Sequence, residues 1–267
     1  MKSYDTHAHI FTKDLPRAKD SRYSPDYDVT PQDYIAHLDK HHIDCGVLVQ
    51  VSFLGNDNSY MWDAMKKYPL RFKAIAVVEP STSYEVLKEM HKSGFTGARL
   101  NLDSKALPDL RSHEYQTFFA NLKKLDWHIE LHNTDLKALV PTLLEAGLKV
   151  VVDHYGRPKG DNPLEDENLL YLLELGETKR VWVKLSAPYR IDKNIQGYAF
   201  AKSAIPLFLE KFEHTNLLWG SDWPHTQYED VTDYDSMYQQ IIELVDKDIL
   251  HIMMCKAPEL LFSKVKV

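Results

Sequence analysis

The chain is poor in cysteine and carries no excess of positive charge. Its 267 residues include two cysteines, Cys45 and Cys255, which form no CxxC pair. Because two cysteines are too few for a disulfide framework, a reducing compartment, the cytoplasm, is expected. The formal net charge of −7 argues against a nucleic-acid partner, whose phosphates call for a basic face.

Long apolar runs are also missing. No stretch approaches the roughly 20 apolar residues of a membrane helix. Asp5, His7 and His9 interrupt the N-terminus where a signal peptide needs an unbroken apolar segment, so we expect no membrane partner. The chain has no GxGxxG after a predicted strand and no G-x-S-x-G elbow, so water is the expected attacking group in any hydrolysis.

Short apolar runs alternate with segments of helical spacing along the chain. The runs predict strands at 3–11, 45–53, 71–79, 94–102, 127–133, 149–156, 180–187 and 216–224. Helices are expected at 31–42, 57–68, 83–93, 113–124, 134–146, 163–176, 196–212 and 233–245. This order is typical of a (β/α)8 TIM barrel, which has about 250 residues. We expect one α/β domain over residues 1–267, with a doubly wound open sheet as the alternative.

Polar side chains recur on one parity of the predicted strands, opposite apolar ones. The set is Asp5, His7, His9, Gln50, Ser52, Arg99, Asn101, His128, Glu130, His132, Lys184, Ser186 and Asp222. Because helices would cover the outer face of a barrel, this parity must point inward, where so many polar groups need a solvated pocket. In the sixth strand Asp153 has the opposite parity to His154, so we expect Asp153 to face outward, in a structural salt bridge or a contact with a helix.

Imidazoles and a carboxylate fall near the C-terminal ends of four predicted strands, where barrel enzymes carry their chemistry. His7 and His9 present two rings to one point, which suits a divalent metal or a carbonyl oxygen. His132, His154 and Asp222 close the fifth, sixth and eighth strands. Each of these residues alone could be an ordinary core or loop residue whose polar group is hydrogen-bonded. Together, however, they would converge at one barrel mouth.

Five segments, taken in order, resemble the amidohydrolase superfamily. They are DTHAHIF, GARLN, VVDHYGRP, KLSAPYRI and LLWGSDWPH, joined by RYSP at 22–25 and VQVSFLGNDN at 49–58. More narrowly, the chain is similar to the lactonase branch, of which 2-pyrone-4,6-dicarboxylate lactonase is typical. The resemblance runs from Asp5 to Asp222 and more faintly to Pro258. It implies a hydrolase that opens a cyclic ester in the catabolism of aromatic compounds.

The resemblance also implies the catalytic roles. Asp222 would be the general base that activates the hydrolytic water. His7, His9 and His154 would surround the lactone carbonyl oxygen, and no metal would be required.

The resemblance further implies how a carboxylated lactone is bound. Arg99 and Arg190 would bind its carboxylates, and Tyr23 would lie near it. Lys105 stands where the lactonase has a second arginine on this strand, and it keeps the charge but loses the planar fork, so the identity of the lactone is left open. Further substrate contacts are expected from Ser52, Asn101, His132 and His225. Arg157 is left open between substrate binding and helix capping.

A metal ion could use the same side chains. The ligand set of the metal-dependent relatives is complete here, with His7, His9, His132, His154 and Asp222. Zinc is therefore possible, and His7, His9 and Asp222 would be its preferred ligands. Two alternatives to a lactonase stay open, a zinc-dependent decarboxylase of an aromatic or unsaturated acid and a non-catalytic barrel that binds an organic anion. An oligomer is also possible, since barrels pair through ordinary helix faces.

Overall fold

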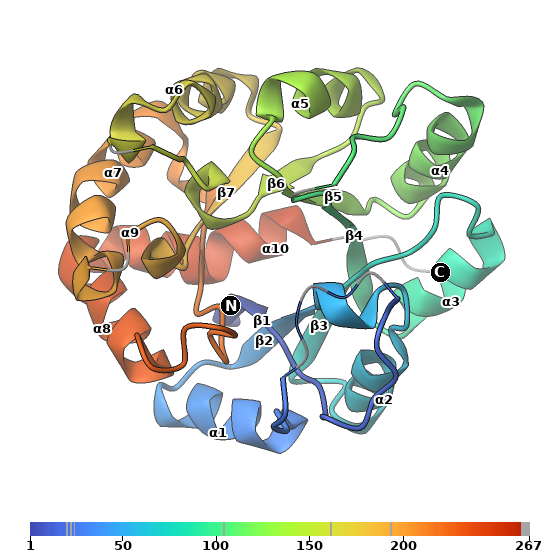
Figure 1. Ribbon diagram of the computed structural model, residues 1–267, viewed down its shortest axis with the longest axis horizontal. Helices are drawn as coiled ribbons and strands as arrows, with labels where there is room; N and C mark the ends of the chain where they lie inside the picture. The colour runs from blue at the N-terminus through green and yellow to red at the C-terminus, as the bar shows by residue number, and fades with distance from the viewer. Residues whose placement is uncertain are drawn as a thin grey trace.

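The computed structural model contains one sheet of eight parallel strands in the order β1 to β8, ringed by helices (Figure 1). It describes residues 1–19, 21, 23, 25–103, 105–160, 162–192 and 194–262, so Arg22 and Ser24 of the RYSP segment lie outside the described residues. The strands are β1 (Tyr4–Ala8), β2 (Cys45–Val49), β3 (Phe72–Ala76), β4 (Phe95–Asn101), β5 (His128–His132), β6 (Val150–Val152), β7 (Val181–Ser186) and β8 (Leu217–Gly220). Each lies within a predicted strand.

Helices follow the strands and cover the outside of the sheet (Figure 1). They are α1 (Pro31–Lys40), α2 (Ser59–Lys67), α3 (Tyr84–Lys92), α4 (His113–Lys124), α5 (Leu136–Glu145), α6 (Glu167–Glu174), α7 (Tyr198–Lys211), α8 (Tyr234–Leu244), α9 (Lys247–His251) and α10 (Ala257–Leu261). Side chains that accept backbone N–H bonds mark several starts, such as Thr30 in a capping box before α1 and Asp166 before α6. None of the described helices is long and apolar enough to cross a membrane.

The barrel closes where β8 meets β1. The backbone N–H of Asp222 donates to the His7 carbonyl, and that of His9 donates to the Trp223 carbonyl, each at 2.8 Å. Gly220 permits this approach, because a Cβ at that position would lie 2.6 Å from the Cβ of His7. The predicted (β/α)8 barrel is therefore confirmed, and the open-sheet alternative is wrong.

The lower half of the barrel interior is an apolar plug. Its inward side chains are Tyr4, Cys45, Val47, Val49, Ile75, Val151, Trp182 and Leu218, and they pack on Ala257, Leu261 and Phe262. Figure 1 shows α10 crossing behind the strands, against their N-terminal ends. This plug leaves the opposite, C-terminal end of the barrel for polar chemistry.

The parity prediction fails on β1 and β2, and also for Asp153 after β6, which is described with the site below. In β2 it placed the valines outside, but Val47 and Val49 point into the plug. Gln50 follows the strand, and its side chain donates to the Asp57 carbonyl at 2.5 Å. In β1 the register shifts between Asp5 and Ala8, which removes Asp5 from the face of His7. The Asp5 carboxylate accepts instead from Ser221 Oγ at 2.6 Å, just after β8.

Candidate active site

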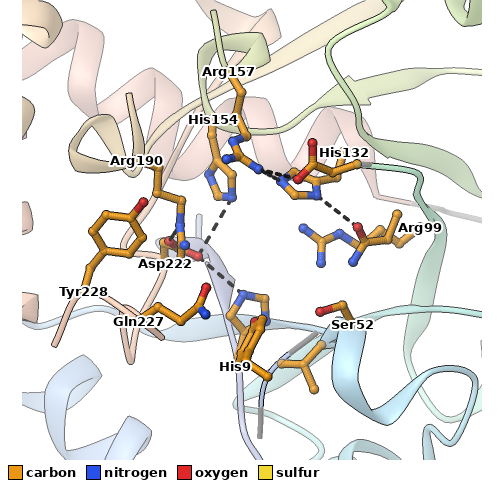
Figure 2. Close-up of a pocket in the computed structure, with 14 residues that line it drawn as sticks. His9, Ser52, Arg99, His132, His154, Arg157, Arg190, Asp222, Gln227 and Tyr228 are labelled. Carbon is orange, nitrogen blue, oxygen red and sulfur yellow. Dashed lines mark hydrogen bonds and ion pairs between the residues drawn. The ribbon is translucent and has the colours of Figure 1, made fainter. Parts of the chain in front are cut away.

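A polar pocket opens at the C-terminal ends of the strands (Figure 2). It encloses about 310 Å³ and is lined by His9, Tyr23, Val51, Ser52, Arg99, Asn101, Asp103, His132, His154, Arg157, Arg190, Asp222, Gln227 and Tyr228. Many of these end or follow a strand, as Asn101 does in β4 and His132 in β5. Barrel closure therefore brings distant segments of the sequence to one mouth.

Asp222 lies at the centre of the pocket floor. Its Oδ2 accepts from the Tyr189 hydroxyl at 2.5 Å and from Arg190 Nε at 2.6 Å. Its Oδ1 has no hydrogen bond from the described residues. Burial raises the pKa of Asp222, but Arg190 and His154 outweigh burial and hold this pKa well below its usual range. The carboxylate is thus ionised and keeps one oxygen free to accept a proton.

Three imidazoles face the free oxygen of Asp222. Their Nε2 atoms lie 3.4 Å from Oδ1 in His9, 3.7 Å in His7 and 3.9 Å in His154. His9 donates from Nδ1 to the Val49 carbonyl at 2.7 Å. His7 is fully buried beneath the pocket, and its Nδ1 lies 3.0 Å from the Lys184 ammonium. The structure therefore brings together the four residues that the sequence assigned to catalysis.

His154 reaches the floor through an unusual backbone. Strand β6 ends at Val152, and His154 adopts a φ of 52°, a left-handed conformation that non-glycine residues rarely take. Its Nδ1 bonds to Ser186 Oγ at 2.8 Å. Strand alternation from the inward Val151 also points Asp153 into the barrel, so its predicted outward orientation is wrong, although the predicted salt bridge exists.

Two carboxylates and two cations fill the barrel below the histidines. Arg99 Nη2 lies 2.7 Å from Asp153 Oδ2, and its Nη1 donates to the Gln50 carbonyl at 3.1 Å. The Lys184 ammonium pairs with Glu130 and lies 3.6 Å from Asp153 Oδ1. All four charged side chains are at most 5% exposed. The two carboxylates face two cations, which offsets part of the cost of burying each charge, and burial still raises the pKa of Glu130 to about 7.

One wall of the pocket holds His132 in a defined protonation state. Its Nδ1 lies 3.0 Å from Asn101 Oδ1, and its Nε2 lies 3.1 Å from Arg157 Nη1. A guanidinium only donates, so the ring accepts at Nε2 and donates from Nδ1. Burial lowers the pKa of His132 well below its usual range. Arg157 also donates to Asp103 at 3.1 Å, and its side chain is 26% exposed, so the side chain lines the pocket while the backbone N–H caps the 3₁₀ turn His154–Gly156.

A neighbouring wall, formed after β7, carries Arg190. Its guanidinium carbon lies 5.0 Å above the Tyr228 ring, and its side chain is 15% exposed. Tyr189 beside it is fully buried and lies 3.1 Å from Nδ1 of His225. His225 is itself buried behind Tyr189, and burial lowers its pKa to about 4. His225 therefore backs the wall and is not a lining residue.

Of three further residues that were predicted to contact the substrate, two line the pocket and one does not. Tyr23 and Ser52 line the pocket, Tyr23 from the segment after β1 and Ser52 from a 3₁₀ turn after β2. Lys105 is exposed and is not among the lining residues. A substrate contact of Lys105 stays a prediction.

The distances also allow a metal ion. Ligand atoms of His7, His9 and Asp222 all lie within 4.8 Å of one another, so the trio named from the sequence is brought together. The hydrogen bond on the far side of the His9 ring suits a metal ligand, because ligating histidines donate their other N–H to a carbonyl or carboxylate. The far side of the His7 ring does not suit a metal ligand, since His7 Nδ1 faces the Lys184 ammonium. His132 is unsuited as well, because Arg157 occupies its Nε2. The donor set therefore fits zinc by distance but not by hydrogen bonding.

Several site residues had no predicted role. Glu130 and Lys184 were expected on the inward parity, but no chemistry was assigned to them. Tyr189 was passed over, although it directly precedes Arg190 in the sequence. Gln227 and Tyr228 lie in the loop after β8, where no local pattern marks them. The apolar, inward Val151 was the available signal for Asp153, since residues two apart share a face.

Comparisons with known proteins agree with this geometry. The amidohydrolase family matches residues 4–262. A 4-sulfomuconolactone hydrolase from Hydrogenophaga intermedia is 30% identical over 86% of this chain and 77% of its own length. A 2-pyrone-4,6-dicarboxylate hydrolase from Comamonas testosteroni is 30% identical over 85% of this chain and 78% of its own length.

Solved structures give the same result. A probable 2-pyrone-4,6-dicarboxylic acid hydrolase from Acinetobacter baumannii, with citric acid bound, superposes with a TM-score of 0.94 at 38% identity, covering 98% of this chain and 99% of its own. A 5-carboxyvanillate decarboxylase from Sphingomonas paucimobilis reaches 0.66 at 12% identity over 98% of both chains, a likeness of fold alone. With the family match over nearly its whole length, the chain belongs to the amidohydrolase family.

Proposed function

We propose that this protein hydrolyses the ring ester of a small lactone that carries acidic groups. The observation that carries the proposal is the ionised Asp222, whose Oδ1 is free while Oδ2 is held by Tyr189 and Arg190. A fixed, ionised carboxylate with one open oxygen is suited to take a proton from water. The relatives whose names describe lactone hydrolases support the same reaction class.

The pocket walls support an acidic substrate. Arg157 follows β6 and Arg190 follows the neighbouring β7, and both line the pocket with partly exposed side chains. Arg99 also lines the pocket, but Asp153 and the Gln50 carbonyl already occupy its two terminal nitrogens. We therefore assign the acidic groups of the substrate first to Arg157 and Arg190, because arginine forks bind carboxylates and related anions. Arg99 then acts mainly by adding positive charge to the floor.

The reaction needs only water and the side chains present. Asp222 removes a proton from water as the oxygen attacks the lactone carbonyl carbon. The carbonyl oxygen gains negative charge, which hydrogen-bond donors and the positive charge at the pocket floor stabilise. The ring C–O bond then breaks, and the ring oxygen receives the proton that Asp222 carries. The product is an open-chain acid with one new carboxyl group, which releases its proton to solvent, and one new hydroxyl or enol group.

The decarboxylase alternative has weaker support. The decarboxylase structure resembles this chain at the level of fold only, whereas the lactone hydrolases are 30% identical over most of the chain. Zinc chemistry would also need free ring nitrogens, and Lys184 and Arg157 occupy nitrogens of His7 and His132.

The two thiols, Cys45 and Cys255, are free and buried, which supports our further proposal of a reducing, cytoplasmic compartment.

A lactone screen tests the proposed function. Carboxylated pyrones, muconolactones and sugar lactones are incubated with the protein, with and without a chelator, and ring opening is followed by absorbance and acid release. We expect opening of an acidic lactone, with kcat falling by about 10²- to 10⁴-fold in Asp222→Asn. Asp235→Asn, on the outer surface of α8, is the matched control and should keep full activity. Unchanged turnover in Asp222→Asn, or release of CO2 in place of an open-chain acid, would overturn the proposal.

A further inference from the structure

The two histidines of the opening motif meet different groups behind their rings. His9 Nδ1 lies 2.7 Å from the Val49 carbonyl, and a carbonyl only accepts hydrogen bonds. The proton of a neutral His9 ring is therefore on Nδ1. Its Nε2, which faces Asp222 Oδ1 at 3.4 Å, is left as an acceptor.

His7 meets the opposite kind of group. Its Nδ1 lies 3.0 Å from Lys184 Nζ, and an ammonium only donates. The carboxylate oxygens nearest to this nitrogen are farther away, Asp153 Oδ1 at 3.4 Å and Glu130 Oε1 at 3.6 Å. Neither of these two oxygens has a hydrogen bond from the described residues, which agrees with a Nδ1 that carries no proton. The proton of His7 is therefore on Nε2.

The consequence appears on the pocket floor. His7 Nε2 and Asp222 Oδ1 are both buried without a hydrogen-bond partner among the described residues, and they lie 3.7 Å apart. A donor, the His7 N–H, and two acceptors, Asp222 Oδ1 and His9 Nε2, lie within 4.8 Å of one another. A water molecule matches this set, because its oxygen can accept from His7 while its hydrogens are donated to Asp222 and His9. A metal ion does not match it, because a metal needs a lone pair from every ligand.

We infer that Lys184 is a positioning residue that fixes His7 as a hydrogen-bond donor, opposite to His9, so that the floor holds a water oxygen and does not hold a metal ion. Lys184 does not line the pocket and so acts through His7. Glu130 and Asp153 hold the ammonium in place, and Arg99 balances the remaining charge. This inference rests on the proposed function for its catalytic meaning, but the protonation of the two rings stands independently of it.

Nitrogen NMR of the wild-type protein tests the ring protonation directly. Two-bond ¹H–¹⁵N spectra distinguish a protonated ring nitrogen from one with a lone pair, and the His7→Asn and His9→Asn variants assign the signals. We expect His7 to be protonated on Nε2 and His9 on Nδ1. The same tautomer in both rings, or a proton on Nδ1 of His7, would overturn the inference, even if the protein hydrolyses a lactone. The expected pattern without any lactone hydrolysis would sink only the proposed function.

Zinc binding of Lys184 variants gives a second readout. In Lys184→Met, the Nδ1 proton can be donated to Asp153, which frees Nε2 as a ligand, and we expect zinc affinity to rise by about 10- to 100-fold. Lys184→Arg keeps a donor and should bind zinc as weakly as the wild type. The double variant Lys184→Met/Glu130→Gln removes one charge of each sign and serves if the single variant does not fold. Equal zinc affinity in the wild type and in a folded variant that lacks the lysine would contradict the inference.

Kinetics separate positioning from a purely structural role. Because Lys184 does not touch the substrate pocket, its loss should lower kcat and leave KM nearly unchanged. Lys184→Arg should recover much of kcat, since it restores a donor behind His7. A rise in KM with an unchanged kcat would argue against positioning. So would a failure of Lys184→Arg to recover kcat while both variants keep the wild-type circular dichroism spectrum.

Discussion

The hydroxyl of Tyr189 lies 2.5 Å from Oδ2 of Asp222, on the side of the carboxylate that faces away from the three imidazoles. Together with Arg190 it occupies one oxygen of the proposed base and leaves the other for water. Tyr189 is buried and its pKa is raised well above the usual range by burial and by Asp222. It therefore stays a neutral donor to the carboxylate.

Tyr189→Phe should shift the pH dependence of the reaction. The hydroxyl stabilises the ionised form of Asp222, so its removal raises the pKa of Asp222 and moves the acid limb of kcat/KM to higher pH. We expect kcat/KM at neutral pH to fall about tenfold, equal to about 1.4 kcal/mol of transition-state stabilisation. Tyr171→Phe on α6 is the control. An unshifted acid limb would remove Tyr189 from the account of the base.

Arg157→Met should weaken the binding of acidic lactones selectively. Losing a charge-assisted contact of about 1.5–3 kcal/mol raises KM by about 10- to 100-fold, while kcat changes little because Arg157 is not bonded to Asp222. Arg111→Met tests the same substitution at a surface arginine that is paired with Glu145 and should leave KM unchanged. If an uncharged lactone suffers the same rise in KM, Arg157 shapes the pocket and does not bind an acidic group.

Stability should fall as the pH drops below neutrality. Burial lowers the pKa values of His7, His128, His132 and His154 well below the usual range, whereas the unfolded chain takes up protons near pH 6.5. Below that pH the unfolded state binds more protons than the native state. The free energy of unfolding should then decrease by up to about 1.4 kcal/mol per pH unit for each of these histidines.

Urea unfolding between pH 8 and about pH 5.5 measures this slope. His128 lies below the pocket, and its Nδ1 has no hydrogen-bond partner among the described residues, so His128→Asn should reduce the slope by the share of one histidine. Asp153 and Asp222 have lowered pKa values, so their contribution is lost in a separate window below the pKa of an unfolded aspartate. A stability that stays constant or increases from pH 7 to about pH 5.5 would contradict the assignment of buried, neutral histidines.

Much of the fold and several of the residues that meet at the pocket could be predicted because strand alternation is a local property. It placed Glu130 and Lys184 inside the barrel, and both are buried there. It failed for Asp5, where a register shift intervenes, for Val47 and Val49, which point inward, and for Asp153, where it was read from the wrong neighbours. His154 enters the site through a left-handed backbone conformation, which no periodic pattern can indicate.

Which ring nitrogens of His7 and His9 donate hydrogen bonds could not be predicted from the sequence, for a different reason. His7 and Lys184 are separated by 177 positions, and His9 and Val49 by 40. Only closure of the barrel decides what lies behind each ring. The motif His-x-His is therefore compatible with a metal site and with a metal-free site, and the groups behind the two imidazoles distinguish them.

The contact between β1 and the residues after β8, which closes the barrel, also sets the distances between Asp222 and the neighbouring histidines. The two backbone hydrogen bonds that join the end of β1 to the residues after β8 come from His9 and Asp222 themselves, so the proposed general base and the adjacent imidazoles are held in place by the contact between the first and last strands of the barrel. Slight fraying of the first strand would spread these groups apart while the helices remain intact. On gradual heating, turnover should therefore disappear before the helical signal does, and a binding partner or lattice that clamps the N-terminus should delay that loss.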